Sequence, residues 1–136
     1  MRVMNGKKLI FVALVSAVLL LGLCSTVTAS ASNHDGKQVH DMANALLHMN
    51  HHPTSADKEH LAAIANDSSA SAQVREVARI IMGLSHKASG GDRNKLQAII
   101  DDSSTSEHVR TIANIIMNLN HKPSSADKER LRTMMN

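Results

Sequence analysis

Apolar residues recur along this chain with a fixed period. Val39, Val74 and Val109 open three copies of one 35-residue unit, and the copies align without a gap. The start of each copy places apolar side chains at helical spacing. In the second copy these residues are Val74, Val77, Ala78, Ile81 and Leu84. Because so short a unit cannot bury its apolar face alone, the period predicts helical modules that pack on their neighbours.

A break in the helical pattern divides each copy into two helices. It is marked by Pro53, by Gly90-Gly91 or by Pro123. A hydroxyl residue follows each break, with an aspartate three positions later, which is typical of a capped helix start. These pairs are Thr54 and Asp57, Ser89 and Asp92, and Ser124 and Asp127. The pattern predicts an all-α protein, a right-handed stack of three helical hairpins (a short α-solenoid) over residues 39–73, 74–108 and 109–136.

The repeats resemble HEAT-like α-helical hairpin repeats over residues 39–136. The resemblance is carried by an aspartate, a Val-Arg pair and two apolar positions. In the second copy these are Asp67, Val74-Arg75, Ala78 and Ile81, and in the third Asp102, Val109-Arg110, Ala113 and Ile116. The first copy departs from the pattern with His40 in place of the arginine. What the resemblance implies is a scaffold that binds a partner along its surface.

The first 31 residues are predicted to be a secretory signal peptide. Basic residues precede an apolar run from Leu9 to Leu23, and Ala29-Ser30-Ala31 offers a cleavage site after Ala31, with cleavage after Ala29 as the alternative. A lipoprotein signal is not favoured, because Leu23 stands where that motif needs a small residue before Cys24. We expect an exported protein, periplasmic or secreted, with a flexible tail over residues 32–38.

Removal of this segment changes the composition. Three of the 15 basic residues and none of the 12 acidic ones leave with it, so the remaining chain has no net charge. The only Cys and the only aromatic residue, Phe11, leave as well. A neutral chain without aromatic stacking platforms is not expected to bind nucleic acid.

No enzymatic motif is visible in the sequence. Metalloprotease, phosphate-loop and serine-hydrolase signatures are absent, and the Ser, His and Asp residues stand where caps and turns need them. We therefore expect a non-enzymatic binding or scaffold protein whose partner is a protein or peptide. A weaker alternative is a helical chaperone of the cell envelope.

Basic residues recur at the start of the second helix of each hairpin. In a stack they would align into ladders able to meet an acidic peptide. These candidate partner-binding residues are Lys58, His60, Arg93, Lys95, Lys128 and Arg130. Net charge also changes along the repeats, from two basic and five acidic groups in residues 32–73 to five basic and two acidic groups in residues 109–136.

One histidine is identical in all three copies, at His51, His86 and His121. It follows the last apolar residue of the first helix, where a donor can meet free carbonyl groups, so a structural role is expected. In a stack, copies one unit apart would lie roughly 10 Å or more from each other. At that distance they could not share a metal ion.

The alternative function is a periplasmic copper- or nickel-binding protein that uses the His-rich N-terminal region. Cleavage after Ala31 would leave a free amine two residues before a histidine, which is a square-planar nitrogen set for Cu²⁺ or Ni²⁺. The candidate ligands are Ser32, Asn33, His34, His48, His51 and His52. Self-association is a separate expectation, because Met134 and Met135 would expose apolar surface at the end of the third hairpin.

Overall fold

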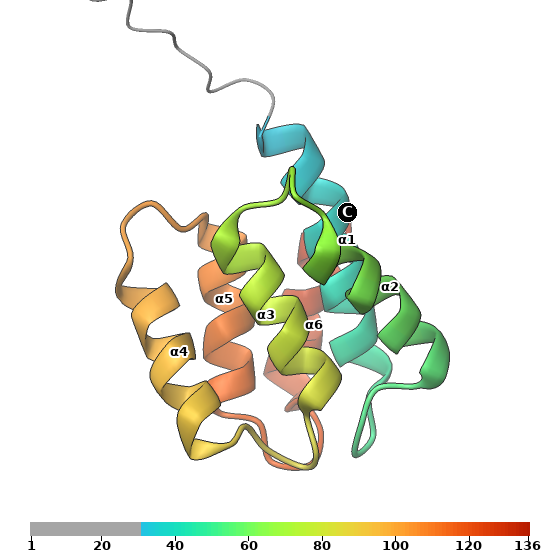
Figure 1. Ribbon diagram of the computed structural model, residues 1–136. Helices are drawn as coiled ribbons and strands as arrows, with labels where there is room; N and C mark the ends of the chain where they lie inside the picture. Colours follow the sequence, from blue (N-terminus) through green and yellow to red (C-terminus); the bar gives the residue numbers. More distant parts are fainter. Residues whose placement is uncertain (1–30) are drawn as a thin grey trace, which may run out of the picture.

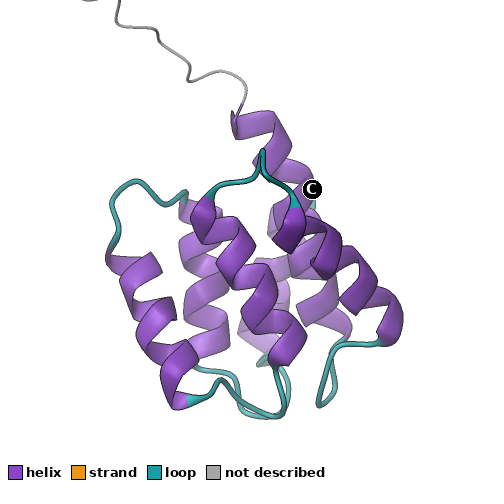
Figure 2. Ribbon diagram, viewed as in Figure 1, coloured by secondary structure: helices purple, strands orange, loops and turns teal. Residues whose placement is uncertain are grey.

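The computed structural model describes residues 31–136, in which every regular element is a helix (Figures 1 and 2). The predicted signal peptide lies almost wholly outside the described residues. The helices are α1 (Ala31–His48), α2 (Ser55–Asn66), α3 (Ala72–Gly83), α4 (Gly90–Asp101), α5 (Glu107–Met117) and α6 (Ser125–Met134). The all-α class and the hairpins are confirmed. Within this range no helix combines the length and hydropathy needed to cross a bilayer.

The predicted helix starts are confirmed by their caps. Before α2, the Thr54 hydroxyl accepts a hydrogen bond from the Asp57 amide at 3.1 Å, and the Asp57 carboxylate accepts one from the Thr54 amide at 3.0 Å. Ser89 and Ser124 accept the corresponding amide bonds at 3.2 and 3.1 Å before α4 and α6. Each cap satisfies amide groups that the first helical turn leaves free.

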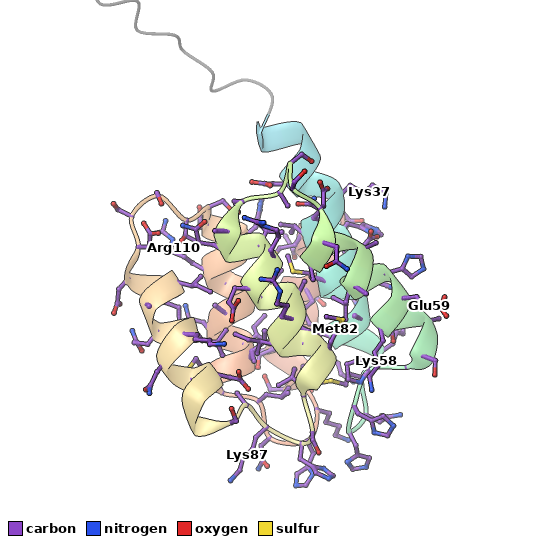
Figure 3. The ribbon with its side chains drawn as sticks, in the orientation of Figure 1. Lys37, Lys58, Glu59, Met82, Lys87 and Arg110 are labelled. Carbon is purple, nitrogen blue, oxygen red and sulfur yellow. The ribbon has the colours of Figure 1, made fainter. Side chains whose placement is uncertain are left out.

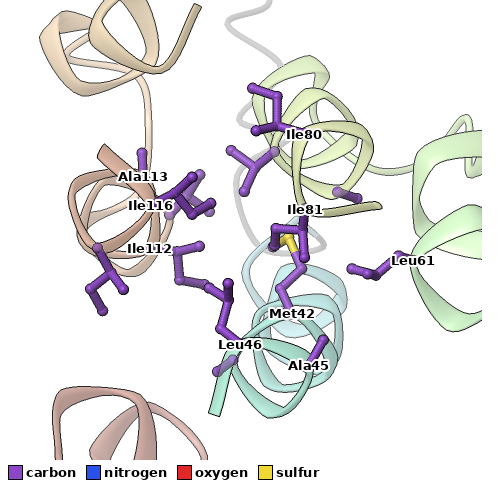
Figure 4. Packing of buried hydrophobic residues seen from close by; sticks show 14 of the residues in the cluster. Met42, Ala45, Leu46, Leu61, Ile80, Ile81, Ile112, Ala113 and Ile116 are labelled. Carbon is purple, nitrogen blue, oxygen red and sulfur yellow. The ribbon is translucent and has the colours of Figure 1, made fainter. Parts of the chain in front are cut away.

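The hairpins close into a ring instead of forming an open stack. The inner helices α1, α3 and α5 pack against one another around a common axis, with α2, α4 and α6 outside them (Figure 4). Each outer helix packs mainly on the inner helix of the next hairpin: α2 on α3, α4 on α5, and α6 on α1. The solenoid prediction is corrected by the contact between α6 and α1. An open stack exposes apolar surface at both ends, and ring closure buries both surfaces against each other.

The core occupies the space between the three inner helices. Small side chains allow these helices to approach closely, because the alanine shared by all copies (Ala43, Ala78, Ala113) is completely buried. Larger side chains fill the axis, among them Met42 and Ile116 (Figure 4). The leucine shared by the outer helices, at positions 61, 96 and 131, is also completely buried. Each of these shared apolar positions is therefore a core position.

The first helix is longer than predicted. The segment 32–38, expected as a flexible tail, forms the first turns of α1. An ion pair of 2.8 Å joins Lys37 to Asp41 one turn later, and the Gln38 amide donates to Asp67 at 2.9 Å. At the other terminus, Met134 and Met135 are partly buried against the core, so the apolar end proposed for self-association is partly covered within one chain.

Candidate metal centre

The turns from inner to outer helix all project a histidine outward. Each turn runs between two buried anchors separated by three residues, and the histidine is the middle one of the three. The anchors are Met49 and Pro53, Leu84 and Ala88, and Leu119 and Pro123. With both ends of the turn held in the core, the middle residue must face solvent. Met49 is thereby a core residue, in agreement with its position in the period.

The backbone at two of these histidines adopts an uncommon conformation. His86 and His121 have φ of 69° and 65°. The Lys87 amide donates to the Ser85 carbonyl at 2.8 Å, and the Lys122 amide donates to the Asn120 carbonyl at 2.8 Å, so each histidine is centred in a γ-turn. This positive-φ form of the γ-turn is strained. Strained conformations persist where surrounding contacts fix them, and they are concentrated at functional sites.

Backbone hydrogen bonds between repeats supply those contacts. The His86 amide donates to the His51 carbonyl at 3.0 Å, and the His121 amide donates to the His86 carbonyl at 2.7 Å. The three turns are thus joined in sequence around the axis of the ring. The histidine that meets a helix-end carbonyl is a different one: His48 Nδ1 lies 3.0 Å from the Asn44 carbonyl oxygen.

The three imidazole rings face one another. Ring centroids are 5.2 Å apart for His51 and His86, 5.6 Å for His51 and His121, and 4.8 Å for His86 and His121. His86 Nδ1 and His121 Nδ1 are 3.0 Å apart. The predicted separation of 10 Å or more is wrong, because the hairpins surround one axis and bring their turns together.

This cluster has the composition and size of a metal site. One ring nitrogen from each histidine lies within 4.8 Å of the other two, and all three residues are exposed. Zn–N bonds of 2.0–2.1 Å at tetrahedral angles place ligand nitrogens about 3.3 Å apart. The 3.0 Å pair is close to this value, and exposed imidazoles can close the longer separations by rotating. Three protein ligands would leave one coordination position open toward solvent.

The residues predicted as alternative metal ligands do not form one cluster. Ser32, Asn33 and His34 lie in the first turn of α1, whereas His48 ends that helix. His52 is exposed in the following turn. Of the predicted set, only His51 belongs to the three-histidine cluster.

The predicted partner-binding residues lie on three separate helices. In residues 31–136 the outer helices α2, α4 and α6 make no contact with one another, so their basic residues occupy different faces of the ring. Two of these residues already have partners in α3 and α5. The Arg93 guanidinium donates to the Met117 carbonyl at 2.8 Å, and Lys95 pairs with Glu76 at 2.7 Å. Lys58, His60, Lys128 and Arg130 complete the set.

The signal that could have identified the cluster is the identity of the histidine in every repeat. An exposed position in three equal modules becomes a shared site when the modules close around an axis. Comparison of the chain with protein-family models, curated proteins and solved structures finds no significant match.

Proposed function

We propose that this protein binds a transition-metal ion through His51, His86 and His121. The observation that carries the proposal is the convergence of three imidazoles, one from each repeat, within 4.8 Å. Neutral imidazole suits zinc, copper and nickel. Three ligands arranged around an axis favour tetrahedral Zn²⁺ over the square-planar set of Cu²⁺ or Ni²⁺.

The ion would join the three repeats. Each ligand belongs to a different hairpin, so one ion would tie together the turns after α1, α3 and α5. The ring is already closed by apolar packing, and the ion would add to its stability by binding the folded state. The proposed role is metal binding without catalysis, and the secretory character of residues 1–31 supports a place outside the cytoplasm.

Calorimetric titration of the exported chain with Zn²⁺ tests this proposal. We expect one ion per chain, and we expect Co²⁺ in its place to give the visible absorption of a tetrahedral site. His86→Ala and His121→Ala should each abolish the absorption, whereas the control variant His108→Ala, also exposed, should retain it.

A second variant distinguishes metal binding at this centre from metal binding at the predicted N-terminal copper site. His34→Ala removes the imidazole of that motif and leaves the three-histidine cluster intact. Retained Zn²⁺ binding in His34→Ala supports the proposed centre. Binding that is lost in His34→Ala and unchanged in His86→Ala would contradict it.

A further inference from the structure

Each hairpin has an outer groove between its own two helices. The groove exists because every outer helix packs mainly on the next hairpin and leans away from its own inner helix. The grooves have volumes of about 270 Å³ between α1 and α2 and about 500 Å³ between α5 and α6, and the groove between α3 and α4 consists of two cavities of about 350 and 250 Å³. Their lining residues correspond through the 35-residue period, so the grooves can be compared position by position.

Side chains bridge the second groove. Lys95 on α4 pairs with Glu76 on α3 at 2.7 Å, and the Gln73 amide donates to Asp102 at 2.7 Å. The hydrogen bond from Lys95 holds the pKa of Glu76 below its ordinary value. The first groove has a bridge of the same kind, from Gln38 to Asp67. In both grooves an acceptor carboxylate belongs to the chain itself.

The third groove keeps the cation and loses the acid. Arg130 stands at the position of Lys95, and Thr111 stands at the position of Glu76. Among the described residues, Arg130 forms one ion pair, with Asp127 at a distance of 3.8 Å. The Asp127 carboxylate also accepts a hydrogen bond from the Ser124 hydroxyl at 2.6 Å as part of the helix cap. The Arg130 side chain is 66% exposed and lines the groove, and its guanidinium has N–H donors left over for a further acceptor.

We propose that the groove between α5 and α6 binds a carboxylate side chain from an acidic segment of a partner protein. The carboxylate would take the place that Glu76 holds in the second groove, with Arg130 as its ion-pair partner and the Thr111 hydroxyl as a neutral donor. Arg–carboxylate contacts favour a two-pronged geometry. The third repeat carries five basic and two acidic residues, which adds longer-range attraction for such a segment. Met134, from α6, contributes an apolar wall.

Residue exchange between the grooves provides the test. The probe is a fluorescein-labelled peptide of alternating Glu and Ala, and the same peptide with Gln for Glu is its control. Fluorescence anisotropy should rise with the Glu peptide only.

Arg130→Gln should weaken binding of the Glu peptide about tenfold or more, because it removes one charged contact. Thr111→Glu should weaken it to a similar degree, because it gives Arg130 an internal partner. Lys95→Gln, the matched change in the second groove, should leave binding unchanged.

The reverse exchange sharpens the test. Glu76→Thr removes the internal acid of the second groove and should raise the number of bound peptides from one to two. Circular dichroism confirms that each variant is folded. Equal binding by wild type, Arg130→Gln and Thr111→Glu would overturn the proposal, and so would the absence of any anisotropy change at protein concentrations up to about 1 mM. Neither result bears on the histidine centre, which Zn²⁺ titration tests separately.

Discussion

The two ends of the helical ring carry polar turns of equal regularity but different organisation. At one end the turns from inner to outer helices come together (Figure 1), and the label of Lys87 marks this end in Figure 3. At the other end the serine-rich turns bond within themselves, since the Ser69 and Ser104 amides donate to the carboxylates of Asp67 and Asp102 at 2.9 and 2.8 Å. The histidine turns are bonded not only within themselves but also to the neighbouring repeat.

This difference shows how distance from the central axis decides whether the turns of different repeats can meet. A serine turn ends one helix and caps the next, so its hydrogen bonds are satisfied locally and each copy acts alone. A histidine turn is held by buried anchors close to the axis, where each copy meets the other two. Residues near the axis can therefore combine one side chain from every repeat into a site that no single repeat could form.

The largest expected effect tests ring closure, on which the meeting of the histidines depends. Leu131 lies on α6, which packs mainly on α1, and it is completely buried. Leu61 on α2 and Leu96 on α4 are its equivalents in the other repeats, and they are also completely buried. We expect Leu131→Ala to lower the free energy of unfolding by about 2–5 kcal/mol, the range for large-to-small core changes. Urea denaturation followed by circular dichroism measures this loss.

The matched variants are Leu61→Ala and Leu96→Ala. In a closed ring the three positions are equivalent, so their losses should agree within about a factor of two, the usual context dependence. A terminal helix of an open stack would tolerate the change better. A loss for Leu131→Ala well below the other two would therefore argue against closure.

The next effect concerns the histidine end. Zn²⁺ at 100 times its dissociation constant should stabilise the folded state by about 2.7 kcal/mol, because binding to the folded state shifts the unfolding equilibrium. Thermal unfolding with and without Zn²⁺ measures the increase, and His121→Ala should remove it. Ser104→Ala at the opposite end should keep the full increase. An increase retained in His121→Ala would assign the stabilisation to another site.

A smaller effect is expected at the serine end. The Ser71 and Ser106 hydroxyls accept hydrogen bonds from the Val74 and Val109 amides at the starts of α3 and α5. Replacing either serine by alanine should cost about 1 kcal/mol of stability, the typical value for loss of a helix cap. Zn²⁺ affinity measured by calorimetry should not change. A large change in affinity would mean that the two ends are coupled through the inner helices.

Much of the fold could be predicted from the sequence because its signals are local. Helical spacing and the hydroxyl–aspartate pairs depend on neighbours a few residues away, and they predicted the starts of α2, α4 and α6. Ring closure depends on how α6 meets α1, which are far apart in sequence, and the period is the same in a ring and in a stack. The prediction that the shared histidines stand apart was wrong for this reason alone.

The third groove shows a second limit. The period assigned Arg130 and Lys95 to one class of exposed basic residue, because both occupy the same position in an outer helix. Their difference depends on the residue opposite, Glu76 or Thr111, and the identity of that neighbour requires the tertiary structure. Repeat sequences predict equivalent positions well, whereas differences between equivalent sites arise from contacts across the groove.

The smallest expected effect is the titration of Asp102 in a serine-rich turn, which should differ from the pH dependence of the histidine turns. The Ser104 hydroxyl donates to the Asp102 carboxylate and, as the largest cause, lowers its pKa from the ordinary value of 3.8, with the Ser104 amide and Gln73 adding to the shift. A carboxyl group whose pKa is lowered on folding contributes stability at pH values above its unfolded-state pKa. This contribution is lost as the pH falls from 3.8 through the lower pKa of the folded state.

Carboxyl-carbon NMR should therefore show Asp102 titrating below 3.8, and Ser104→Ala should return its pKa toward that value. Zn²⁺ binding requires neutral imidazoles, so Zn²⁺ affinity should also fall on acidification, and this fall should be the same in Ser104→Ala as in the wild type. A wild-type Asp102 that titrated at its ordinary pKa would show that the Ser104 hydrogen bonds do not form in solution. This would contradict the conclusion that the serine-rich turns are stabilised by their own hydrogen bonds.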